Sequence, residues 1–236
     1  MNKNHYFKSL CVAAAFLVAG FGVRAQESET SVYINGMLPT AAFNDAINFE
    51  FPDQLMKREQ AATGATAGLG ITARYGLWFD LGVGQLEPFA EASFLWNSVK
   101  GSVRDHYDNI FSPANVRAKA PAYFNLPIML GIKYRYDLNA TIRPYAEVAL
   151  GCDFFFISGN GLKDGVWYKY KPTGNLCWMV GLGSYIGEFV SVGLFYEGLG
   201  GHLIDYTRKT ADVVGPINTT VKRNIGEFGI RLGFHF

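Results

Sequence analysis

The chain has 236 residues, of which 17% are charged, 15% are aromatic and 27 are glycine. Charged residues make up about a quarter of an ordinary soluble domain, so this composition argues against a helical bundle. The formal net charge of +1 provides no basic field for nucleic acid and no acidic field for cations. Composition therefore excludes function classes that depend on a strong overall charge.

The N-terminus has the three regions of a secretory signal peptide. Lys3 and Lys8 form a short basic region, an apolar run extends from Leu10 to Val23, and Ala25 precedes Gln26 at a plausible cleavage site. The apolar run is shorter than the roughly 20 residues that a membrane-spanning helix needs. We therefore predict a signal peptide over residues 1–25, with the mature chain beginning at residue 26.

Apolar residues alternate with polar or small residues along most of the mature chain. The closing sequence GEFGIRLGFHF places Phe228, Ile230, Leu232, Phe234 and Phe236 on one face, and a period of two is typical of a strand with two unlike faces. The same pattern predicts eight strands, each long enough to cross a bilayer at a tilt. The predicted strands lie near residues 30–40, 65–78, 86–97, 122–137, 142–157, 174–186, 190–201 and 222–236.

The predicted connections alternate between short and long. Short turns near residues 80–85, 138–141 and 187–189 alternate with long polar connections near residues 41–64, 98–121, 158–173 and 202–221. This pattern is typical of an all-β, eight-stranded antiparallel up-and-down transmembrane barrel with short periplasmic turns and four long extracellular loops. The predicted outer-membrane β-barrel domain spans residues 26–236, and both termini would then be periplasmic.

An internal repeat supports the predicted register. Phe79-Asp80-Leu81 followed by LEPFAEA matches Tyr136-Asp137-Leu138 followed by IRPYAEV. Each copy falls at a predicted short turn and the strand that follows it. Pro88 and Pro144 then lie near strand starts, where a missing backbone donor matters least.

The placement of glycine decides which face of the strands points inward. A secreted lipocalin-like barrel would have its apolar face inside, whereas a membrane barrel has it outside. Ten strand glycines, among them Gly76, Gly181 and Gly229, share the face that carries the charges. Inside a narrow eight-stranded barrel they would make room for long side chains. The predicted charge network of the lumen comprises Arg74, Glu87, Glu91, Lys133, Arg135, Arg143, Glu147, Asp153, Glu197, Glu227 and Arg231.

The opposite face carries aromatic residues toward the strand ends, which resembles two interfacial girdles. Cys152 and Cys177 lie on neighbouring predicted strands but on opposite faces, so a disulfide between them is not expected. The girdle residues are Phe94, Trp96, Tyr134, Tyr136, Phe154, Phe156, Phe234 and Phe236.

The segments FNLPIMLGIKYRY (residues 124–136), IRPYAEVALGCDFFF (residues 142–156) and the terminal IRLGFHF carry a family resemblance. The chain resembles the small eight-stranded barrels of the OmpA/OmpX architecture and, most closely, the PorT-like outer-membrane barrels of Bacteroidota. The resemblance implies a fold and a location but transfers no catalytic residue. Pro127 fits the family's aliphatic-Pro-aliphatic pattern, and in a closed barrel it is expected to mark a β-bulge.

No metal, phosphate-binding or hydrolase motif is found, so no cofactor is expected. Three functions remain open. The favoured one is a non-enzymatic barrel with a lumen filled by its own charged side chains and with loops for envelope structure or surface interaction. The second is a narrow pore for small solutes or ions. The third is a lipid-modifying enzyme using Ser158 or Ser184 with His202.

The expected partners are outer-membrane lipid and, during biogenesis, the machinery that assembles outer-membrane barrels. The terminal strand, with Phe228, Ile230, Leu232, Phe234 and Phe236 on one face, resembles the signal that this machinery recognises. An extracellular ligand of the loops is possible in this interpretation, but the sequence does not identify it.

Overall fold

A computed structural model describes residues 27–44, 64–101, 104–105, 119–138, 141–161, 167–209 and 217–236. The predicted signal peptide and much of the long connections lie outside these ranges. Within them, no helix is long and apolar enough to cross a membrane. The elements are β1 (Glu27–Pro39), α2 (Ala41–Asn44), β2 (Ala65–Asp80), β3 (Gly84–Val99), β4 (Tyr123–Tyr136), β5 (Ile142–Ile157), β6 (Asn160–Gly161), β7 (Trp167–Tyr170), β8 (Thr173–Ile186), β9 (Val190–Lys209) and β10 (Ile217–His235).

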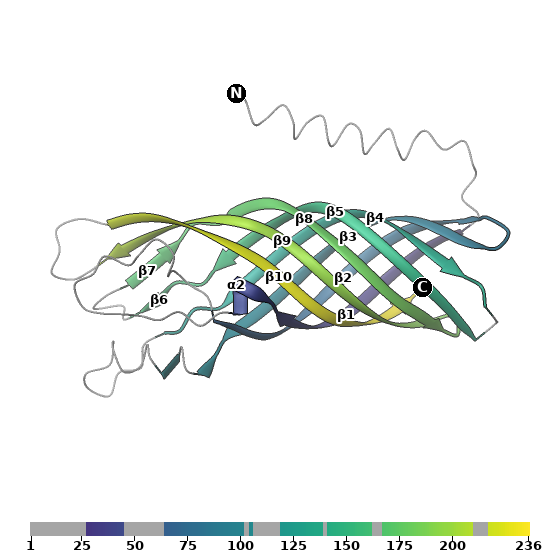
Figure 1. The fold of residues 1–236 in the computed structure, drawn as a ribbon, viewed down its shortest axis with the longest axis horizontal. Helices are drawn as coiled ribbons and strands as arrows, with labels where there is room; N and C mark the ends of the chain where they lie inside the picture. Colours follow the sequence, from purple (N-terminus) through teal and green to yellow (C-terminus); the bar gives the residue numbers. More distant parts are fainter. Residues whose placement is uncertain are drawn as a thin grey trace, which may run out of the picture.

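Eight long antiparallel strands close into a barrel in the order β1-β2-β3-β4-β5-β8-β9-β10, and β10 pairs back onto β1 (Figure 1). Closure satisfies the backbone groups that an open sheet edge would leave unpaired. Phe236 completes this seam, since its N–H and C=O both bond to Thr30 at 2.9 and 3.1 Å. The predicted all-β, eight-stranded antiparallel fold is confirmed.

The two ends of the barrel differ. The short turns β2–β3, β4–β5 and β8–β9 lie at one end, together with the start of β1 and the end of β10, and we call this the turn end (Figure 1). The opposite, loop end carries α2 and the small strands β6 and β7. β7 pairs with the outer part of β9, so the sheet continues beyond the barrel wall there.

Two sets of expected bounds were wrong, namely the end of the strand predicted near residues 190–201 and the extent of two long connections. β9 continues to Lys209 instead of ending near residue 201. Gly200 adopts a φ of 95°, which accommodates a local break in the strand, and the alternation of buried and exposed residues resumes beyond it. The register shift lies opposite, between Ile225 and Gly226. The expected connection at residues 202–221 therefore contains the end of β9 and the start of β10, and the one at residues 158–173 contains β6 and β7.

Pro127 does not mark a bulge. The register between β3 and β4 is the same on both sides of it, since Ala92 pairs with Ile128 and Leu95 pairs with Asn125. Only the pairing between these positions is interrupted, whereas Pro127 still pairs with Asp153 of β5. Because proline has no N–H, part of the β3–β4 hydrogen-bond ladder is lost, but no extra residue is inserted into β4.

Large apolar side chains cover the outside of the barrel. Leu150, Leu69 and Leu182 are 71%, 61% and 66% exposed, and the predicted girdle residues also point outward. A soluble monomer does not expose a continuous apolar surface of this kind. The lipocalin-like alternative, with its polar face outside, is therefore wrong, and the barrel wall is built for a bilayer.

Candidate functional site

The lumen is the candidate site, and the inward glycines make room for its side chains. A Cβ atom at Gly76 would collide with the Glu87 carboxylate, one at Gly181 with Glu147, and one at Gly229 with the ring of Phe195. Glycine residues thus stand opposite long inward side chains. As a result, side chains that start on one wall reach the other.

Five charged side chains form the central layer of the lumen. Arg74 of β2 donates to Glu91 of β3 at 2.6 Å and to Glu147 of β5 at 2.7 Å. Arg231 of β10 donates to the other oxygen of Glu147 at 3.0 Å and contacts Glu197 at 3.5 Å. Because β5 is three strands away from β2 and from β10, these bonds cross the lumen.

Aromatic rings flank both arginines of this layer. The Arg74 guanidinium carbon lies 3.8 Å from the ring centre of Phe89, and that of Arg231 lies 4.4 Å from the ring centre of Phe195. Cation–π contact and bidentate pairing both favour a planar guanidinium over an ammonium. Glu91 and Glu147 occupy equivalent positions in the internal repeat, and both accept hydrogen bonds from Arg74.

A second layer closes the lumen toward the turn end. Lys133 of β4 contacts Glu87 at 2.8 Å and donates to the hydroxyls of Tyr185 at 2.9 Å and Tyr33 at 3.3 Å. Tyr185 of β8 donates in turn to Glu29 of β1 at 2.9 Å. These bonds join four strands around the barrel.

Near this layer, His235 contacts Ser31, Glu29 and Ser191 at 2.8, 2.9 and 2.8 Å. Arg135 covers the ring of Trp78, with 4.1 Å between its guanidinium carbon and the ring centre. The turn end of the lumen is therefore packed with aromatic rings and hydrogen-bonded polar groups.

The loop-end half of the lumen is more acidic. Glu197 and Glu227 are paired opposite each other on β9 and β10, and both are fully buried. Asp153 of β5 lies 3.1 Å from Nε2 of His202, which was expected in a loop but belongs to β9. Within the described residues, no group of three or more His, Cys, Asp or Glu side chains could hold a metal ion.

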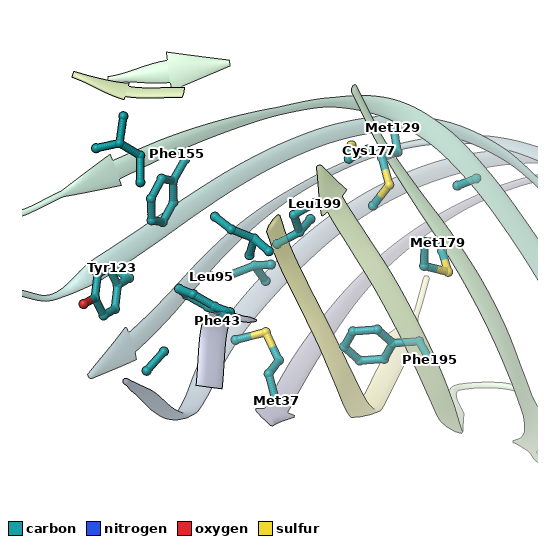
Figure 2. Packing of buried hydrophobic residues seen from close by; sticks show 14 of the residues in the cluster. Met37, Phe43, Leu95, Tyr123, Met129, Phe155, Cys177, Met179, Phe195 and Leu199 are labelled. Atoms are coloured by element: carbon teal, nitrogen blue, oxygen red, sulfur yellow. The ribbon is translucent and has the colours of Figure 1, made fainter. Parts of the chain in front are cut away.

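An apolar cluster closes the lumen above the acidic side chains. Phe43 of α2 is 1% exposed and packs edge-on against Tyr123 and Phe155, at 5.4 and 6.2 Å between ring centres (Figure 2). Leu95 and Leu199, which come from opposite walls, lie beside it on the side of the barrel's middle. This apolar filling was missed, because the lumen was expected to be charged throughout.

The structure places the predicted charge network as follows. Ten of its members are buried inside the barrel, and Arg143 is half-buried near the turn end, where it donates to the Gly187 carbonyl. The buried members are Arg74, Glu87, Glu91, Lys133, Arg135, Glu147, Asp153, Glu197, Glu227 and Arg231. Sequence reasoning missed the neutral partners Tyr33, Tyr185 and Ser191, whose inward parity was the available signal.

The wall and the connections together decide the class of this barrel. It is closed, apolar outside and filled inside, with tight turns at one end and longer connections at the other. The fold is that of a small eight-stranded outer-membrane β-barrel.

The known proteins similar to this chain are found among solved structures. No family model and no curated protein matches the chain. Among solved structures, the outer membrane protein OprG from Pseudomonas aeruginosa is 14% identical over 91% of this chain and 98% of its own, with a TM-score of 0.49. Ail of Yersinia pestis, in complex with the heparin analogue sucrose octasulfate, is 12% identical over 89% of this chain and 100% of its own, with a TM-score of 0.46.

The outer membrane enzyme PagL is also similar, at 14% identity over 87% of this chain and 97% of its own, with a TM-score of 0.35. Similarity at this level concerns the fold alone. It transfers neither an activity nor a ligand to the barrel. The resemblance to the PorT-like family of Bacteroidota has no family-model match and stays a prediction.

The serines considered for an enzyme do not join His202. Ser158 accepts a hydrogen bond from the backbone N–H of Ala122 at 2.8 Å, and Ser184 donates to the Tyr185 carbonyl at the turn end. The hydroxyl of Thr173 lies 3.4 Å from Nδ1 of His202. The expected serine–histidine pairs are therefore not formed in the barrel.

Cys152 and Cys177 are not joined by a disulfide, as the parity argument predicted. Gly151, not Cys152, pairs with Cys177 across β5 and β8. Cys177 consequently points into the apolar part of the lumen, where it is 2% exposed.

Proposed function

We propose that this protein is a non-enzymatic integral protein of the bacterial outer membrane, with a lumen closed by its own side chains and a loop end that serves envelope structure or surface contact. The observation that carries this proposal is the bridging of the lumen at Glu147, whose two oxygens accept hydrogen bonds from Arg74 and Arg231. Direct bonds between opposite walls at that level support a lumen that is closed to water.

Closure on both sides of this layer supports the same proposal. Lys133, Tyr185 and Glu29 link the walls toward the turn end, and Phe43 fills the lumen toward the loop end. A pore would need polar walls without such cross-links, as in the wider barrels that hold an aqueous channel. In this proposal the oppositely charged side chains of the lumen pair with one another across it and thereby close it.

The orientation follows from the same proposal. A cleaved signal peptide would export the chain, the turn end with both termini would face the periplasm, and the loop end would face outward. The outward face of β10, from Phe228 to Phe236, is the segment that the assembly machinery would recognise. This role stays a prediction.

The alternative of a narrow pore makes a different prediction for planar bilayers. The purified wild-type barrel is expected to give no reproducible single-channel steps, because three levels of the lumen are closed. Reproducible steps whose size changes in Arg135→Ala or Glu147→Ala, but not in the exposed control Glu188→Ala, would contradict the closed lumen and establish a pore.

A further inference from the structure

Exposed charges are segregated between the two ends of the barrel. At the turn end the exposed ionisable residues are acidic, namely Glu27, Asp80, Asp137 and Glu188, and no lysine or arginine among the described residues is exposed there. At the loop end, among the residues that the structure describes, exposed basic residues outnumber exposed acidic ones. They include Arg104, Lys119, Lys169, Lys171 and Lys222, against Asp105.

Three of these lysines lie together on the outward face of the sheet formed by β7, β9 and β10. Lys222 of β10 pairs with Leu203 of β9, and Lys169 of β7 pairs with Thr207. The backbone N–H of Lys171 bonds to the Asp205 carbonyl at 2.9 Å, between these two positions. Lys169 and Lys171 therefore lie about 7 Å apart along the β7 side of β9, since a strand rises about 3.4 Å per residue, and Lys222 lies on the opposite side of β9, about two strand spacings of roughly 4.8 Å away.

Alternation fixes the side to which these lysines point. The neighbours His202, Ile204 and Tyr206 of β9 are buried inside, so Leu203 and Thr207 face outward, and their partners face the same way. Tyr168 is buried, and the adjacent Lys169 is exposed. The three ammonium groups thus belong to one outer surface.

An apolar surface adjoins these lysines on the membrane side. Leu203 is 59% exposed directly beside Lys222, and Phe228, which is 44% exposed, follows on β10 toward the middle of the barrel. The aliphatic part of the Lys222 side chain lies over Gly201, and a side chain at position 201 would displace it. A ligand held here would contact apolar wall with one part and ammonium groups with another.

We propose that Lys169, Lys171 and Lys222 form a binding site for the phosphate groups of an acylated lipid in the outer leaflet. Phosphate complements a row of ammonium groups, and the exposed Leu203 and Phe228 suit acyl chains, which a soluble anion lacks. Asp205 of β9 faces the same side and is half-buried, so three exposed lysines stand against one carboxylate among the described residues of this surface. The proposal rests on the proposed function in placing the loop end outward.

The test uses the mature barrel in phosphatidylcholine nanodiscs that contain a minor fraction of a bis-phosphorylated, acylated glucosamine disaccharide. Lipid retained on the barrel is measured by native mass spectrometry. The wild type is expected to retain the phosphorylated lipid preferentially. The triple variant Lys169→Gln, Lys171→Gln and Lys222→Gln is expected to lose this preference by about a hundredfold, because each lysine near a charged surface contributes about 1 kcal/mol.

The matched control removes charge elsewhere at the loop end, with Arg104→Gln and Lys119→Gln, and is expected to retain the lipid as the wild type does. Equal retention by the triple variant would overturn the site. Competition by inorganic phosphate as strong as that by the lipid would overturn the lipid as ligand. Conductance in the wild type would contradict the proposed closed lumen without changing the lipid result, so the two failures are distinguishable.

Discussion

Replacing Glu147 by alanine is expected to lower the free energy of unfolding of the barrel by about 3–5 kcal/mol, the cost of breaking a buried ion pair. Glu147 is 3% exposed and holds both Arg74 and Arg231. Without it, the ion-pair contacts of Arg231 are those at 3.5 and 3.8 Å, to Glu197 and Glu91. Two guanidinium groups would then share a confined space without the carboxylate that bridges them.

The measurement is urea unfolding in phospholipid vesicles, followed by tryptophan fluorescence. Glu188→Ala at an exposed turn is the control and is expected to change the free energy by less than about 0.5 kcal/mol. The double variant Glu147→Leu with Arg231→Met is expected to recover part of the loss, since apolar replacements relieve the unpaired charge. A loss in Glu147→Ala no larger than that in Glu188→Ala would contradict the structural role of the central layer.

Replacing Leu150 by arginine is expected to cost about 2–4 kcal/mol when the barrel is folded in a bilayer. Leu150 lies near the middle of β5, between Leu130 and Trp178, and is 71% exposed on the outer wall. Its side chain therefore faces hydrocarbon, where a guanidinium group loses its hydration.

The matched control is Leu138→Arg, at the short turn between β4 and β5, where leucine is 60% exposed. Near the interface this change is expected to cost no more than about 1 kcal/mol. The same unfolding assay measures both variants. Equal tolerance of the two arginines would show that the outer wall does not face hydrocarbon.

The eight-stranded fold could be predicted because alternation survives in every long strand. In β4, Ile128, Leu130 and Ile132 face outward, and Met129 and Lys133 face inward, as the period of two requires. Residue parity alone placed Arg74, Glu147 and Arg231 inside. Their mutual pairing could not be predicted, because it depends on which walls approach each other across the lumen.

The apolar closure of the loop-end half could not be predicted from alternation. Both faces of a strand are apolar there, as in the run Phe94-Leu95-Trp96, where Leu95 is buried and its neighbours are exposed. Phe43 enters the lumen from α2, which lies outside the strand pattern altogether. The extension of β9 was hidden by the cluster Gly198, Gly200 and Gly201, which suggests a loop in the sequence.

Accessibility of Cys177 tests the closed lumen most directly. Cys177 faces the lumen among Met129, Met179 and Leu199, between the central charged layer and Phe43. The measurement is modification of the mature Cys152→Ala barrel, in sealed vesicles, by a cationic, membrane-impermeant thiol reagent, which the nearby Asp153 and Glu197 would attract. Cys177 is expected to stay unmodified until the chain is unfolded in urea, whereas an added Lys171→Cys thiol at the loop end reacts at once. Modification of Cys177 in the folded barrel as fast as that of Lys171→Cys would contradict a closed lumen.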